Sequence, residues 1–189
     1  MTRPLSLVTI SGSLRERSFN SALLRALPEF FPDHVTLTRL EWRGLPVLDV
    51  DDEQAHGLPA QVRELQQQIR ASDGLIIATP EYNHGVPGGL KNALDWLSRG
   101  PMPHGLYGVP TAILGASNGP IGTFRAQAML RQTLAALNAP TLPQPQVLVG
   151  NAQDRFDDSL TLVDAATRKF IAGWAEAVVT WMERFRAPA

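Results

Sequence analysis

The chain has no cysteine among its 189 residues. Without a thiol, the protein forms no disulfide and has no cysteine nucleophile, no cysteine-ligated zinc and no iron–sulfur cluster. An excess of charge is also missing, because 17 lysine and arginine residues face 18 aspartate and glutamate residues, for a formal net charge of −1. Surfaces that bind nucleic acid or anionic lipid need a basic excess, so we expect no partner of either kind.

Long hydrophobic runs are absent as well. No stretch approaches the roughly 18 apolar residues of a membrane span, and the run Leu5–Ile10 is too short for a signal peptide. We therefore expect no membrane association and a cytoplasmic location. The hydrophobic content of 44% suffices, at this length, for one sizeable core. We expect residues 1–189 to form a single domain.

What is present is an alternation of strand and helix patterns. Short β-branched runs indicate buried strands, and apolar residues at helical spacing indicate amphipathic helices. The predicted strands cover 5–10, 35–40, 74–78, 109–115 and 146–149. The predicted helices cover about 19–27, 59–71, 90–98, 124–137 and 160–185. Ser18 and Thr123 are placed to cap the first and fourth helices, and 42–57 is predicted as a long surface loop.

Such an alternation predicts an α/β fold with a parallel sheet and helices on both faces. Five strands, with polar or glycine-rich loops after the first, third and fourth, match the doubly wound flavodoxin-like order 2-1-3-4-5. In sheets of this kind, ligands bind outside the carboxyl ends of the strands. The three loops are therefore the candidate site.

The loop after the first strand is a candidate phosphate site. It carries hydroxyls at Ser11, Ser13 and Ser18, a guanidinium at Arg15 and an amide at Asn20. The helix that follows would add its N-terminal N–H groups and positive dipole end. The loop is neither a P-loop nor a G-x-G-x-x-G turn. The alternative is that the serine before the helix merely caps it and the arginine is solvated.

The loop after the third strand reads Thr79 to Asn92 and is rich in proline and glycine. It offers backbone N–H groups, the Tyr82 ring and the Asn83 amide, which can hold the edge of a flat heteroaromatic ring and cover its face. His84 is a possible proton donor, although a loop histidine is more often polar surface.

Other candidate sites are weak. His34, His56 and His104 lack metal-ligand spacing, and the acidic run 49–53 lacks the pattern of a calcium loop. No serine lies in a G-x-S-x-G elbow. We predict no metal site and no catalytic side chain.

In these loops the sequence resembles the NADPH-dependent FMN reductase family, whose members include bacterial chromate, quinone and azo-dye reductases. The matching stretches are SGSLRERSFN (11–20), TPEYNHGVPGGLKNALDWLSR (79–99) and, more weakly, GASNGPIGTFRAQAMLRQ (115–132). The resemblance runs from about residue 5 to 150.

The resemblance implies an FMN site built from all three loops. The phosphate and ribityl end would contact Ser11, Ser13, Arg15, Ser18, Phe19 and Asn20. The isoalloxazine would lie along Pro80, Glu81, Tyr82 and Asn83, partly through backbone groups. Ser117, Asn118 and Gly119 would close the third side. NADPH or NADH would deliver hydride to flavin N5 and leave, and a quinone, azo compound, chromate or similar small acceptor would then take the electrons (ping-pong).

The resemblance also implies a homodimer or homotetramer. Arg125 would lie at an interface, but 143–147 has no acid to pair with it, so the dimer is better supported. Trp174 and Trp181 are expected in the core or at an interface, and Arg17 is a weak candidate for the 2′-phosphate of NADPH. Two rival functions are a flavodoxin-type FMN electron carrier without nicotinamide turnover, which is usually strongly acidic, and a flavin-free docking domain on the same fold.

Overall fold

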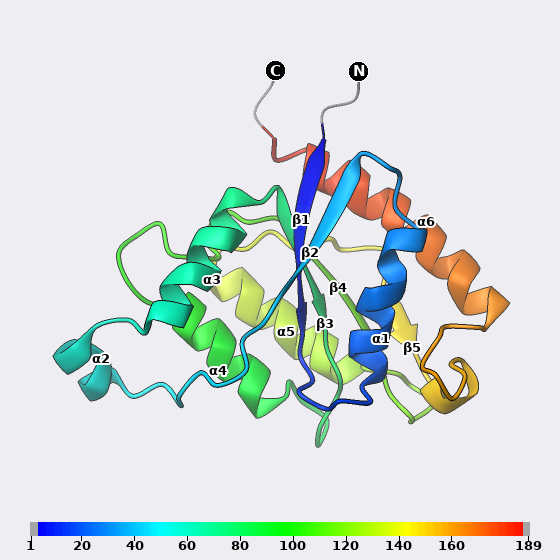
Figure 1. Cartoon of the computed structure of the whole chain (residues 1–189), viewed down its shortest axis with the longest axis horizontal. Helices are drawn as coiled ribbons and strands as arrows, with labels where there is room; N and C mark the ends of the chain where they lie inside the picture. The colour runs from blue at the N-terminus through cyan, green and yellow to red at the C-terminus, as the bar shows by residue number, and fades with distance from the viewer. Residues whose placement is uncertain (1–3, 187–189) are drawn as a thin grey trace.

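A computed structural model describes residues 4–186. One parallel sheet runs through it in the order β2-β1-β3-β4-β5, which confirms the predicted order (Figure 1). The strands are β1 Leu5–Ser11, β2 Val35–Leu40, β3 Gly74–Ala78, β4 Thr111–Ala116 and β5 Val147–Val149.

Helices cover both faces of the sheet, with α1 and α6 on one side and α3, α4 and α5 on the other (Figure 1). The helices are α1 Phe19–Ala26, α2 Val50–His56, α3 Ala60–Ala71, α4 Gly88–Leu97, α5 Phe124–Ala136 and α6 Ala165–Glu183. Two 3-10 turns, η1 Leu27–Glu29 and η2 Ala152–Asp154, follow α1 and β5.

The central strands are buried on both faces, as their continuous apolar sequences require. In β3, Ile76 packs into the core under α1 and α6, which includes Trp174, whereas Ile77 packs into the core under α3, α4 and α5. Fully burying one such side chain contributes about 1.5–3 kcal/mol. Trp174 is thus confirmed as a core residue, and Trp181 is only partly buried.

The structure corrects the prediction that 42–57 is entirely loop, because α2 lies within it. Asp49 caps this helix by accepting a hydrogen bond from Asp51 N at 2.9 Å. Three acidic residues occupy its first turn, where the helix dipole favours negative charge. None of its residues is buried, so no apolar periodicity marks it in the sequence.

The last helix also begins later than predicted. Leu160 has a positive φ of 63°, and α6 starts only after Asp164, whose carboxylate accepts a hydrogen bond from Thr167 N at 2.8 Å. Val163 therefore lies before the helix and is exposed. Phe170, within α6, and Phe185, just after it, are exposed as well. β4 begins at Thr111 rather than residue 109.

Candidate functional site

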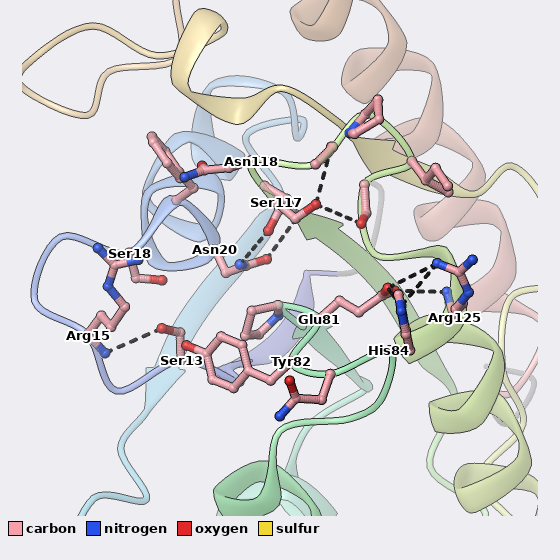
Figure 2. A pocket seen from close by; sticks show the side chains of 18 residues that line it. Ser13, Arg15, Ser18, Asn20, Glu81, Tyr82, His84, Ser117, Asn118 and Arg125 are labelled. Carbon is pink, nitrogen blue, oxygen red and sulfur yellow. Dashed lines mark hydrogen bonds and ion pairs between the residues drawn. The ribbon is translucent and has the colours of Figure 1, made fainter.

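Three loops meet at the carboxyl edge of the sheet and enclose a cavity of about 630 Å³ (Figure 2). They are the β1–α1, β3–α4 and β4–α5 loops that the sequence singled out. The predicted binding residues that line the cavity are Ser13, Arg15, Ser18, Phe19, Asn20, Pro80, Glu81, Tyr82, Asn83, Ser117, Asn118 and Gly119. His84, Ile121 and Arg125 also line it.

Ser11 is the predicted contact that the structure does not bring to the cavity wall. It is buried beneath the β1–α1 loop, where its hydroxyl donates to Ser13 O at 3.2 Å and lies 2.9 Å from Ser21 Oγ. The next residue, Gly12, donates its N–H to Ala78 O at 2.7 Å. A Cβ on Gly12 would lie 2.8 Å from Leu90 Cδ2. Ser11 therefore supports the loop from below, and the missing side chain at Gly12 lets the chain pass close to Leu90 of α4 and to the end of β3.

The N-terminus of α1 faces the cavity and has the features of an anion site. Ser18 is its N-cap, as predicted, because Ser18 Oγ accepts from Ser21 N at 3.2 Å. The first intrahelical bond runs from Ala22 N to Ser18 O, so the N–H groups of Phe19 and Asn20 precede it. No acidic residue lies in the first turn. Capping and anion binding are compatible, since the cap uses the serine oxygen as acceptor and leaves the hydroxyl proton to donate.

Two further groups in the same loop can bind an anion. Ser13 Oγ accepts from Arg15 N at 3.3 Å, which again leaves a hydroxyl proton to donate. The Arg15 side chain is exposed at the rim. Arg17 lies elsewhere, with its guanidinium donating to Asp158 O at 2.8 Å.

Asn20, in the first turn of α1, joins the start of that helix to the end of β4. Its Nδ2 donates to Ala116 O and its Oδ1 accepts from Ala116 N, both at 2.9 Å, and the residue is buried (Figure 2). This paired bond fixes the distance between the first and third loops of the site. One N–H of the amide is left for a ligand.

The β3–α4 loop makes a tight hairpin at the cavity. Tyr82 and Gly85 exchange both backbone hydrogen bonds, at 3.1 and 3.0 Å. Asn83 and His84 between them have positive φ values of 50° and 64°, as a type I′ turn requires. Asparagine tolerates this conformation, but histidine is unusual there. Tyr82 remains 47% exposed and lies on the cavity wall.

Glu81 has a structural role that the sequence did not indicate. Its Oε2 accepts from Arg125 N at 2.9 Å and Ala126 N at 3.1 Å, the first-turn N–H groups of α5. Thr123, which was predicted to cap α5, makes no capping bond, and its Oγ1 instead accepts from Gln127 Nε2 at 3.0 Å. A carboxylate 44 residues upstream thus replaces the local cap.

The other oxygen of Glu81 faces the Arg125 guanidinium and the His84 ring. Oε1 lies 3.8 Å from Arg125 Nη1 and 3.6 Å from His84 Nδ1, and these two nitrogens are 3.1 Å apart (Figure 2). The Glu81 side chain therefore bonds within the protein, and what it presents to a ligand is its backbone.

The third loop is held by its own serine. Ser117 Oγ donates to Gly122 O at 2.7 Å. Gly122 has a φ of 68°, and a Cβ there would lie 2.9 Å from the Leu148 carbonyl carbon. The loop thus turns closely over β5 and directs Asn118 and Gly119 to the cavity.

In residues 4–186, no group of three or more histidine, aspartate and glutamate side chains is placed to hold a metal ion. No helix in this part of the chain is long and apolar enough to cross a membrane. A flavodoxin-like sheet with an anion site and an aromatic wall at its switch point defines a nucleotide-binding class of protein. The donor set fits FMN, since the hydroxyls and helix N–H groups suit its phosphate and the Tyr82 loop suits a flat ring.

The family follows from comparison with known proteins. The sequence profile of the NADPH-dependent FMN reductase family matches residues 5–154. The chain belongs to this family, which confirms the resemblance drawn from the sequence. It is an oxidoreductase that uses FMN with NAD(P)H.

Individual relatives cover the chain almost end to end. An NAD(P)H-dependent FMN reductase of Pseudomonas aeruginosa is 41% identical over 186 residues, which is 98% of this chain and 100% of the relative. A quinone reductase of Escherichia coli K12 is 40% identical over 188 residues, with 98% and 100% covered. The structure of FerB, a flavoenzyme NAD(P)H:(acceptor) oxidoreductase of Paracoccus denitrificans, superposes with a TM-score of 0.86 at 31% identity and covers 96% of this chain and 98% of FerB.

Proposed function

We propose that the protein passes electrons from NAD(P)H through FMN bound in the three-loop cavity to a quinone. The observation that carries the proposal is the convergence of an anion site and an aromatic wall in one cavity of about 630 Å³. That volume is within the usual range of small-molecule sites, about 300–1,000 Å³. The named relatives that act on quinones support the choice of acceptor, and azo compounds and chromate are the alternatives.

Different residues would bind the two ends of the cofactor. The hydroxyls of Ser13 and Ser18, the guanidinium of Arg15 and the first N–H groups of α1 would hold the phosphate. Asn20 would contact the ribityl end through its remaining N–H. Ser11 acts from below, through the shape of the loop.

The β3–α4 and β4–α5 loops would hold the ring. Pro80 and Tyr82 would lie along it, with Glu81 and Asn83 contributing backbone groups, and Asn118 and Gly119 would close the third side. FMN held there would supply the redox chemistry, namely hydride uptake from NAD(P)H at N5 and electron delivery to the second substrate in a separate half-reaction. The protein orients both reactants, and no side chain needs to act as acid or base.

Steady-state oxidation of NADPH and NADH with benzoquinone tests this proposal. The FMN-loaded protein should oxidise the nicotinamide in the presence of quinone. When both substrates are varied, double-reciprocal plots of the initial rate should give parallel lines, as a ping-pong scheme requires. A protein that binds FMN but shows no nicotinamide turnover would be an electron carrier, and the proposal would be wrong.

We also propose that the protein is a homodimer in the cytoplasm. Each chain would form one domain. Ile121, Phe124 and Met129 are 55%, 50% and 48% exposed beside the cavity, and a second subunit would cover such apolar side chains. The tetramer has less support, because Arg125 pairs with Glu81 and His84 of its own chain. Light scattering coupled to gel filtration distinguishes monomer, dimer and tetramer.

A further inference from the structure

A second, smaller cavity of about 120 Å³ lies on the other side of the β1–α1 loop, against the end of β2. Its charged lining residues are Arg15, Arg25, Arg39, Arg43, Glu16 and Glu41. Four positive charges minus two negative ones leave +2 around this space, whereas the whole chain carries −1. Positive charge is therefore concentrated at this cavity.

The four guanidinium groups of this cavity are not neutralised by the protein. In the described part of the chain, no carboxylate oxygen lies within the 4.0 Å of an ion pair from any of them. Elsewhere, arginines do pair with acids: Arg99, Arg125, Arg155, Arg168 and Arg186. The local excess is thus available to an anion.

Two of the guanidinium groups are already positioned by hydrogen bonds. Arg39 Nη2 donates to the buried Ser21 Oγ at 3.3 Å, and Arg43 Nη2 donates to Leu14 O at 2.6 Å. Each uses one of its N–H groups in this way and keeps the others for a ligand. These two side chains therefore lose less conformational entropy when a ligand binds.

We propose that this cavity binds a phosphate monoester dianion, namely the 2′-phosphate of NADPH. The inference rests on the proposed function, which brings a nicotinamide dinucleotide to the adjacent cavity. Arg15 and Ser13 line both cavities, so the two ligands would be neighbours. A phosphate monoester carries nearly two negative charges at neutral pH and accepts bidentate bonds from arginine. NADH has no group for this cavity, so the protein prefers NADPH.

The test compares NADPH with NADH and adenosine 2′,5′-bisphosphate with 5′-AMP on the FMN-loaded protein. We expect a higher kcat/KM for NADPH, and calorimetry should show tighter binding of the bisphosphate. Arg39→Gln and Arg43→Gln should each lower the NADPH-to-NADH ratio of kcat/KM and the bisphosphate affinity by about tenfold, the usual loss of one charge-assisted contact.

Arg25→Gln separates charge from loop support. Within the described residues the Arg25 side chain has no hydrogen bond or ion pair to another protein group, so its effect on the ratio cannot pass through the shape of the loop. It should also lower the ratio. The matched controls are Arg17→Gln, in the same loop but directed at Asp158 O, and Arg184→Gln on the far end of α6. Both should leave the ratio within about twofold of the wild-type value.

The inference is overturned if the wild-type protein uses both nicotinamides equally and binds the bisphosphate no more tightly than 5′-AMP. It is also overturned if inorganic phosphate competes for the cavity but the arginine variants keep the NADPH preference, since the cavity would then hold free phosphate. A larger effect of Arg17→Gln than of Arg39→Gln would place the 2′-phosphate elsewhere. In all three cases flavin reduction persists, so the proposed function stands; its own failure would appear as absent turnover.

Discussion

At the level of single residues, the cavity keeps its shape through side chains that bond to the backbone of a neighbouring loop. Asn20 bonds to Ala116 at the end of β4, where the third loop begins, and Glu81 bonds to Arg125 and Ala126 at the start of α5, where that loop ends. Each contact joins two of the three loops. The relative positions of the phosphate end and the ring end therefore depend on these two residues.

Glu81→Ala removes the acceptor for two N–H groups at the start of α5. We expect a loss of about 1–3 kcal/mol in the free energy of unfolding, since a helix end without its cap is left unsatisfied. Urea denaturation followed by circular dichroism measures it. Glu64→Ala on the exposed face of α3 is the control and should change stability by less than about 0.5 kcal/mol. Equal stability of the two variants would show that Glu81 does not cap α5.

Ser18→Ala tests the phosphate end of the site. The substitution removes a hydroxyl proton that would reach the phosphate, so the Kd for FMN should rise about tenfold. The Kd for riboflavin, which lacks the phosphate, should rise much less. Fluorescence titration of both flavins gives the ratio. If both constants rose by the same factor, Ser18 would act only as the helix cap.

At the level of elements, the sequence pattern located the helices and strands that pack against the core. It missed the features that do not pack against the core. The stripe Val62, Leu65 and Ile69 marked α3 because it is buried. By contrast, α2 buries nothing and is stabilised by its cap and acidic first turn, which apolar periodicity cannot detect. The cap of α5 was missed for a different reason, since its partner Glu81 is distant in the sequence.

The start of α6 gives a prediction about pH. The Thr167 hydroxyl and N–H, and the nearby Arg155, hold the pKa of Asp164 below its usual value, because they bond to the charged carboxylate. A carboxyl whose pKa is lower in the folded protein stabilises the fold at pH values above its pKa in the unfolded chain, about 3.9. This stabilisation is lost as the pH falls through the pKa of the folded protein. Asp164→Asn keeps a capping oxygen but has no such titration.

The measurement is the free energy of unfolding of the two proteins at pH 7 and at steps down to pH 2. We expect the wild-type advantage over Asp164→Asn to be constant above about pH 5, to begin to fall near pH 4 and to vanish in stronger acid. An advantage that did not change with pH would mean that the carboxylate charge adds nothing to the cap.

At the level of the whole molecule, the topology was predictable because strict strand–helix alternation leaves few arrangements. The order 2-1-3-4-5 in turn places the loops after β1, β3 and β4 at one edge. Twelve of the thirteen predicted binding residues line the cavity, and the sequence was insufficient where a side chain's direction depends on tertiary contacts. Ser11 lies under the loop, and Arg125 reaches the wall from α5, 44 residues beyond Glu81, with which it pairs.

The most direct test of the account is an anaerobic titration of the FMN-loaded protein with NADPH, followed by visible absorbance. We predict that the flavin band bleaches with about one equivalent of NADPH, as a two-electron transfer requires, and returns when benzoquinone is added. Bound FMN that NADPH does not bleach would contradict the reductase, and a protein that does not bind FMN would contradict the assignment of the cavity.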